Sequence, residues 1–152
     1  MGLSSKFSKQ VSVEAKLTIG RWIARFTDPP VLGKGADFGI GVTLKPWQRL
    51  LLSPSVEYSH LDYPDGSEIF EGYVSRTRIN YQFTREWFLR VVVQYDQFDK
   101  VLSFEPLLSY KLNPFTIFYV GSAHNYREFD GEKDFTRTDQ LFFLKLQYLL
   151  RV

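Results

Sequence analysis

The chain has 152 residues, which suits one domain, residues 1–152, and leaves no room for a separate catalytic module beside it. The net charge of +2 gives no electrostatic footprint for a nucleic-acid partner, and the absence of cysteine excludes disulfides and thiolate metal ligands. Aromatic residues make up 17% of the chain, although its mean hydropathy is only -0.21. Strands that alternate apolar and polar residues combine these two properties, whereas a membrane-spanning helix would raise the mean hydropathy.

About eight segments alternate apolar and polar residues with a period of two, which predicts strands with one apolar face. In chain order they are Val11–Ile19, Asp37–Leu44, Arg49–Ser59, Tyr73–Phe83, Trp87–Asp96, Leu102–Leu112, Thr116–Tyr126 and Asp139–Val152. The seventh is ambiguous, because Ile117 and Tyr119 compete with Phe118 and Val120 for the apolar face. We expect bulges or bends at two prolines inside the third and sixth segments, Pro54 and Pro106, because proline lacks the N–H that a ladder needs.

The connections between these segments alternate in length, as in outer-membrane barrels with short periplasmic turns and longer extracellular loops. Tight breaks at Pro46–Gln48, Thr84–Glu86 and Asn113–Phe115 follow the second, fourth and sixth segments. The breaks after the first, third and seventh segments are longer and contain Asp, Pro or Gly, while Gln97–Lys100 is a short exception. An even number of strands predicts both termini at the short-turn end. The expected fold class is therefore all-β, a closed antiparallel up-and-down transmembrane β-barrel in a bacterial outer membrane.

Aromatic residues gather near both ends of the predicted strands, with Leu, Ile and Val between them. Aromatic side chains prefer the depth of the lipid headgroups, so two such bands predict girdles that flank the hydrocarbon layer. The predicted girdle residues are Trp47, Tyr81, Phe83, Trp87, Tyr110 and Tyr148 at the short-turn end, and Tyr58, Tyr73, Tyr95 and Phe142 at the long-loop end. The lipid bilayer, or detergent in its place, is the partner that these faces imply.

The opposite faces carry charged residues of both signs. The lumen of an eight-stranded barrel has room only for side chains, so these charges predict an internal network of ion pairs and hydrogen bonds in a structural or weakly conducting barrel. The residues of this network are Glu14, Lys16, Glu57, Arg76, Arg78, Arg90, Glu105, Lys111 and Lys145. Apolar residues share the same predicted face, which argues against a water-filled pore and keeps open that the chain is one part of a larger, oligomeric barrel. They are Leu51, Phe88, Val92, Leu107, Leu141 and Phe143.

Five short stretches carry a family resemblance: Ser75–Thr84, Phe88–Arg90, Val93–Tyr95, Glu105–Lys111 and Phe142–Leu146. With them, residues 73–152 resemble the C-terminal barrel region of Bacteroidetes-type outer-membrane proteins whose N-terminal domain is similar to carbohydrate-binding family 9. Leu52–Tyr58 resembles the same group. The resemblance implies the fold and the location, and no catalytic residue comes with it.

Two departures from that family are visible. The chain is far shorter, so a carbohydrate function is not carried over, and we expect a truncated or redesigned sequence. It ends in Val152 where the outer-membrane assembly signal usually has an aromatic residue, although the alternation Tyr148, Leu150, Val152 otherwise matches and implies the barrel-assembly machinery as a partner. The first ten residues lack the apolar core of a secretory signal, so the location rests on the strand pattern.

Two histidines, His60 and His124, are candidate general bases near the long-loop rim, each with Ser, Asp or Asn close in sequence. Polar residues are common in loops, so we expect no enzyme, no cofactor and no metal site. Two alternatives stay open. One is a soluble lipocalin-like carrier whose apolar faces line a pocket, and the other is a small outer-membrane enzyme that uses these histidines.

Overall fold

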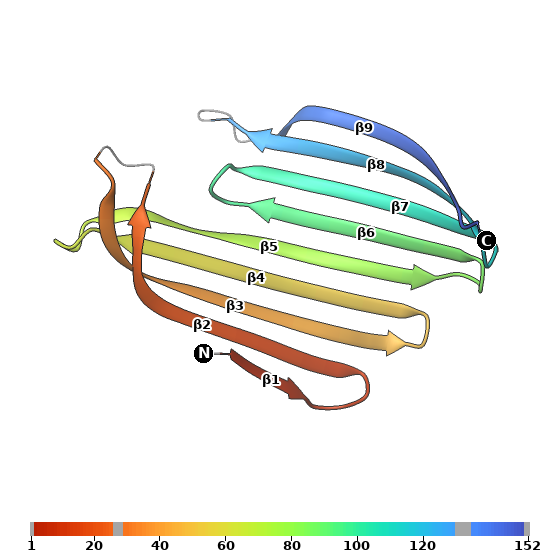
Figure 1. The fold of residues 1–152 in the computed structure, drawn as a ribbon, viewed down its shortest axis with the longest axis horizontal. Coiled ribbons are helices and arrows are strands. Elements are labelled where there is room, and N and C mark those ends of the chain that lie inside the picture. Colours follow the sequence, from red (N-terminus) through yellow and green to blue (C-terminus); the bar gives the residue numbers. More distant parts are fainter. Residues whose placement is uncertain (1, 26–28, 130–134, 151–152) are drawn as a thin grey trace.

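The structure is a computed structural model that describes residues 2–25, 29–129 and 135–150. These residues form a single sheet in which each strand pairs antiparallel with the next along the chain, as Figure 1 shows. The strands are β1 (Gly2–Lys6), β2 (Val11–Ala24), β3 (Val31–Trp47), β4 (Leu50–Asp62), β5 (Glu68–Gln82), β6 (Trp87–Asp96), β7 (Val101–Asn113), β8 (Thr116–Glu128) and β9 (Phe135–Tyr148). The predicted all-β, up-and-down antiparallel architecture is confirmed.

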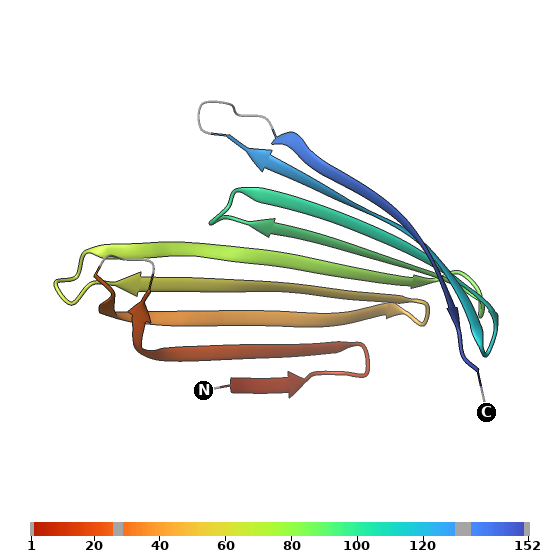
Figure 2. The ribbon, with the colours of Figure 1, turned by 45° about the horizontal axis from the view of Figure 1, so that its top comes forward.

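The sheet has nine strands and is open, since no pairing joins β9 to β1 or β2 among the described residues. Strands β2 to β9 correspond to the eight predicted segments, and β1 is additional. Its sequence has no apolar alternation, and its extended form comes from pairing with Ser12–Lys16 of β2. Because β1 adds one strand and runs the same way as β9, its first residue lies away from the short-turn end, opposite Lys16 in the middle part of β2, whereas β9 ends at the short-turn end (Figure 2). The prediction that both termini lie at the short-turn end is therefore wrong for the described residues.

The two ends of the sheet differ in their connections. At one end β3 continues into β4 through Gln48 and Arg49, and β7 continues into β8 through Pro114 and Phe115. At the other end β4 and β5 are joined by Tyr63–Ser67, a turn in which Gly66 has a φ of 88°. The backbone amide and the hydroxyl of Ser67 donate hydrogen bonds to Asp65 at 3.0 and 2.7 Å, and they lower the pKa of this loop carboxyl.

Bulges occur in four of the ladders, and neither Pro54 nor Pro106 lies at one, whereas Pro46 near the end of β3 lies within the shift at Leu44/Trp47. The register between β3 and β4 is the same on both sides of Pro54, and that between β7 and β8 is the same on both sides of Pro106. The direct partners next to each proline are missing instead, which is the expected effect of a residue without an N–H. The predicted bulges at these prolines are therefore wrong. The register shifts lie at Leu44/Trp47, Leu61/Asp62, Lys111/Asn113 and Asn125/Tyr126.

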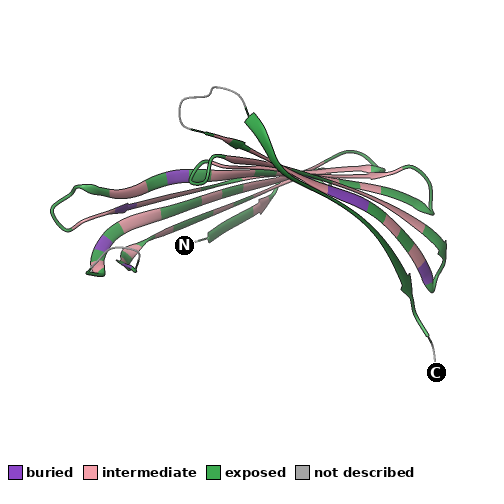
Figure 3. Ribbon diagram, turned by 90° about the horizontal axis from the view of Figure 1, so that it is seen from above, coloured by how far each residue is buried: buried purple, intermediate pink, exposed green. Residues whose placement is uncertain are grey.

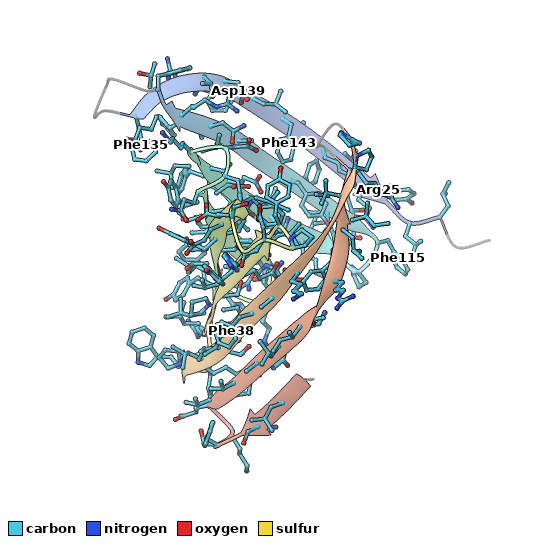
Figure 4. The ribbon with its side chains drawn as sticks, turned by 90° about the vertical axis from the view of Figure 1, so that its left-hand side faces the viewer. Arg25, Phe38, Phe115, Phe135, Asp139 and Phe143 are labelled. Carbon is cyan, nitrogen blue, oxygen red and sulfur yellow. The ribbon has the colours of Figure 1, made fainter. Side chains whose placement is uncertain are left out.

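The register sorts the residues onto two faces, because directly opposed residues point to the same side of a sheet. One face holds the odd-numbered residues of β2, β5 and β6 and the even-numbered residues of β3, β4, β7 and β8, continued on β9 by the even-numbered residues 140–148. Figure 4 shows the sheet as a trough with Phe38 of this face on its outer side and Phe143 on its inner side. We name these faces the convex and the concave surface. The ambiguous segment is thereby assigned, since Phe118 and Val120 lie on the convex surface.

Neither surface is covered by a second layer. Among residues 2–25, 29–129 and 135–150, no large side chain is fully buried, and the buried hydrophobic residues are Ala24, Leu61 and Val92. Figure 3 shows that buried positions are few and scattered in a sheet of exposed and half-buried residues. The accessible area is 11451 Å², whereas a compact monomer of this mass has about 8,000 Å². The described part of the chain therefore leaves the apolar surface of its own sheet uncovered.

Glycines on the concave surface let β2, β3 and β4 bend at the long-loop end. A Cβ on Gly33 would lie 2.6 Å from the backbone oxygen of Asp62, and one on Gly35 would overlap the backbone oxygen of His60. The ring of Trp22 covers Gly35, at 2.9 Å from that Cβ position. Glycine at these two positions therefore allows the strands to approach closely where the sheet curls.

Candidate functional site: the two surfaces of the sheet

The convex surface has a central band of aliphatic side chains that runs across the sheet. Direct partners link these residues from strand to strand. For example, Ile79 of β5 lies opposite Val91 of β6, and Leu89 of β6 lies opposite Leu108 of β7. Several are strongly exposed, up to 75% for Leu144. The band consists of Val13, Ala15, Ile40, Val42, Leu52, Val56, Ile79, Leu89, Val91, Val93, Leu108, Val120 and Leu144. A contiguous exposed apolar surface of this kind marks an interaction surface.

Aromatic side chains border this band at the short-turn end. The rings of Trp87 and Tyr110, which are direct partners, lie 4.6 Å apart, and those of Tyr81 and Phe83 lie 4.8 Å apart with edge-to-face geometry. Trp47 is 67% exposed at the end of β3. Tyr148, the sixth ring predicted at this end, is the last residue of β9. The six rings predicted here thus share one end of the convex surface.

At the long-loop end the aromatic group differs in one member from the prediction. Tyr58 and Tyr73 are direct partners, and the rings of Tyr73 and Tyr95 lie 6.0 Å apart. Phe142 lies in the middle of β9, opposite Ser122, rather than near this end. The ring that contacts Tyr95, at 6.2 Å, belongs to another residue of β9, Phe135.

The register shift at Asn125/Tyr126 explains why the sequence missed Phe135. It changes the parity of β9, so that odd-numbered residues near its start share a face with even-numbered residues farther along. The period-two alternation of β9 therefore begins only at Asp139, and Phe135 lies before it. The only available sequence signal was an aromatic residue placed directly after a loop.

The pair formed by Trp87 and Tyr110 gives a test of the short-turn girdle. We expect a double-mutant cycle with Trp87→Ala and Tyr110→Ala to give a coupling free energy of about 0.5–1.5 kcal/mol, because stacked cross-strand rings stabilise beyond their buried area. Urea unfolding from lipid vesicles measures the four free energies. A coupling of zero would show that the two rings do not meet in the folded chain.

The nine charged residues predicted for the lumen all lie on the concave surface. One row of direct partners runs from Glu14 through Gly41 and Ser55 to Arg76, so two of these charges share a level of the sheet. No two of the nine are within ion-pair distance in this open sheet; the one such contact among the described residues joins His60 and Asp62 on the convex surface, and it is an ion pair only when His60 is protonated. The ion-pair network therefore stays a prediction.

A hydrogen-bonded chain that the sequence did not predict continues the same row across β7, β8 and β9. The hydroxyl of Ser103 donates to Oδ1 of Asn125 at 2.7 Å, and Nδ2 of Asn125 donates to Oδ2 of Asp139 at 2.9 Å. Elsewhere on the concave surface Nζ of Lys145 lies 5.9 Å from the centre of the Tyr119 ring, within cation–π range. Polar side chains on the concave surface thus interact with side chains of the neighbouring strands.

Apolar residues on the concave surface pack against glycines. The ring of Phe143 lies over Gly121, beside Leu107, and the ring of Phe98 from the β6–β7 connection lies over Gly72. Phe88, Leu51 and Leu141 lie on the concave surface together with the charged residues, as the alternation of the sequence predicted. The concave surface is therefore mixed in polarity, with bulky side chains between the charges.

The two histidines lie on the convex surface, each beside one polar residue. Nε2 of His124 is 2.9 Å from the hydroxyl oxygen of Ser122, and Nε2 of His60 is 2.9 Å from Oδ2 of Asp62. A triad needs a nucleophile and a carboxylate on the same histidine. Among the described residues, His124 has no hydrogen-bonded carboxylate, and Nδ1 of His60 is buried without a partner. The geometry supplies two pairs and no triad.

The part of the chain that the structure describes has no group of three or more His, Asp or Glu side chains that could hold a metal ion. No helix in that part is long and apolar enough to cross a membrane. A comparison with known protein families finds no matching family model, and comparisons with curated proteins and with solved structures find no match.

Proposed function

We propose that this chain forms the wall of a transmembrane β-barrel in a bacterial outer membrane, as a structural or weakly conducting protein without catalysis. The observation that supports it is the uncovered convex surface, an aliphatic band bordered by aromatic rings on a sheet with no second layer. A folded domain in water needs at least two layers to bury such a surface, whereas a bilayer supplies the second layer itself. The resemblance of residues 73–152 to outer-membrane barrel regions points the same way.

Strand length and edge chemistry agree with this proposal. Strands β2 to β9 have 10 to 17 residues, and a tilted strand needs about 9–11 residues to cross a bilayer. Within hydrocarbon an unpaired strand edge leaves N–H and C=O groups without partners, so the sheet must close when it inserts. A soluble carrier would need the aliphatic band on the inside of the trough, whereas the register puts it on the convex surface, the outer side on which Phe38 lies in Figure 4.

The three tryptophans provide the decisive experiment, because they lie on different surfaces. Trp47 is on the convex surface, and Trp22 is on the concave surface against Gly35. Two single-tryptophan variants, each with the other two tryptophans changed to Phe, are folded into vesicles of lipids brominated on the acyl chains. We expect the bromines to quench most of the emission of Trp47 and little of that of Trp22. If the emission of Trp22 were quenched and that of Trp47 were not, the proposed orientation would be wrong.

Gel migration and folding conditions add a second readout for the same proposal. After folding into detergent, the chain is expected to migrate faster than the boiled sample, as a closed barrel resists the denaturing detergent. A monomer that folds in plain buffer and binds an apolar ligand would favour the soluble carrier instead.

The concave surface predicts a low conductance. Its bulky apolar and charged side chains fill the space that a small barrel encloses, so no continuous water path remains. We expect little or no steady current when the protein is inserted in a planar bilayer at moderate voltage. A large and stable current would mean that more strands surround the pore than one chain supplies.

A further inference from the structure

The directions of the strands restrict how this sheet can close. Neighbours are antiparallel from β1 to β9, so β1 and β9 run the same way, as Figure 1 shows, while β2 runs opposite to β9. A contact of β9 with β1 would be the only parallel pair in the molecule. A contact of β9 with β2 would continue the antiparallel pattern and would give a barrel of eight strands, β2 to β9.

The two strands β2 and β9 also match in length. Each has 14 residues, and every described residue of β9 is exposed. By contrast β1 pairs only with Ser12–Lys16 of β2, whereas β3 pairs with β2 along its whole length from Val11 to Ala24. The edge of β2 is therefore covered over less than half of its length by β1, and β9 has the length to cover all of it.

The stagger of the sheet is that of a barrel with tilted strands. Direct partners lead from Glu14 step by step to Asp139 on β9. Glu14 lies near the short-turn end of β2, and Asp139 lies near the long-loop end of β9. Closure with tilted strands requires this offset, since each strand must be displaced along its neighbour. In the closed barrel, Glu14 would lie opposite residues of β9 that are closer to its last residue, Tyr148, than Asp139 is.

The curvature brings β2 toward the concave side. In Figure 4 the far part of the β2–β3 hairpin, which ends at Arg25, bends over the side of the sheet on which Phe143 lies, and Figure 1 shows the same hairpin turning out of line toward β8 and β9. The close approaches at Gly33 and Gly35 permit this bend. The open sheet is thus already curled in the direction of closure.

From these observations we propose that β9 pairs antiparallel with β2 of the same chain in the membrane, and that β1 leaves the edge of β2 to make room. This inference rests on the proposed membrane function. It assigns the exposed edge of β9 a partner, and it makes Gly2–Lys6 a strand that protects the edge of β2 until the barrel closes. An eight-stranded barrel with an additional segment at the N-terminal side results.

Cysteine cross-linking tests the seam, because the chain has no cysteine of its own. Ala15→Cys on β2 is combined in turn with Leu144→Cys, Leu146→Cys or Tyr148→Cys, three β9 positions on the convex surface that span the registers allowed by closure. After folding into vesicles and mild oxidation, we expect one combination to give an intramolecular disulfide in most molecules. Ala15→Cys with Lys145→Cys is the matched control, since position 145 is on the concave surface and should stay at background.

A second pair reports on β1. Leu3 is the direct partner of Ala15, so Leu3→Cys with Ala15→Cys should cross-link in the open sheet and lose most of its cross-linking in vesicles. Ser4→Pro, which prevents β1 from pairing along β2, is expected to leave the β2–β9 disulfide at full yield or to increase it. Loss of that disulfide in Ser4→Pro would contradict the proposal.

The remaining outcomes separate this inference from the proposed function. If Trp47 is quenched by the brominated lipids but no β2–β9 disulfide forms, the seam is wrong and the membrane barrel stands. Disulfides between two chains would overturn closure within one chain in favour of a larger oligomeric barrel. A cross-link from Leu3→Cys to β9 would overturn it in favour of a parallel seam. If Trp47 is not quenched at all, the membrane function itself fails.

Discussion

The variant Gly35→Ala is expected to lose about 3 kcal/mol of folding free energy, at the upper end of the cost of overpacking. A Cβ at this position would overlap the backbone oxygen of His60 and would also approach the ring of Trp22 and the side chain of Leu61. A flexible side chain could move aside, but the backbone oxygen of β4 is held by the ladder. The variant must therefore separate β3 from β4 at the point where the sheet bends.

Gly39→Ala is the matched control, on the same strand and the same surface. A Cβ there would meet nothing closer than Cγ of Glu57 at 3.8 Å. Glycine in a strand interior costs about 0.5–1 kcal/mol relative to alanine, so this variant is expected to be neutral or slightly stabilising. Urea unfolding of the two variants in vesicles measures the difference. Equal stabilities would show that β3 and β4 do not approach at Gly35.

The eight long strands could be predicted from the sequence because alternation is a local property of each segment. On β6, for example, Leu89, Val91 and Val93 occupy every second position, and the register places them on one surface with residues of the neighbouring strands. The short strand Gly2–Lys6 has no such signal, since its structure depends on β2 as a template. The local pattern therefore predicts the eight long strands, whereas the ninth strand depends on pairing with its neighbour.

Errors in the predicted site have the same origin. Each bulge changes the parity of a strand, and the sequence carries no mark of the shift at Asn125/Tyr126 that puts Phe135 on the convex surface. Pro54 and Pro106 suggested bulges where none occur, because a ladder can lose partners without a change of register. The hydrogen-bonded chain of Ser103, Asn125 and Asp139 joins three strands, so it could not be found from spacing within one segment.

Placing a charge on each surface of one strand gives the largest difference between a membrane protein and a soluble one. Leu144→Arg puts a guanidinium in the aliphatic band of the convex surface, where lipid would surround it at a cost of about 2–4 kcal/mol. Leu141→Arg puts the same group three positions away on the concave surface, among polar and charged residues, at an expected cost of at most about 1 kcal/mol.

The sign of that difference depends on which medium covers the convex surface. In water the 75% exposed side chain of Leu144 gains solubility when it becomes Arg, so a soluble sheet would tolerate this variant at least as well as Leu141→Arg. Urea unfolding in vesicles gives the free energies, and the fraction of chain that folds into vesicles gives an independent measure. Because both positions are exposed residues of β9, propensity and strand position nearly cancel in the comparison. A Leu144→Arg variant that folds as well as Leu141→Arg would therefore mean that lipid does not contact the convex surface.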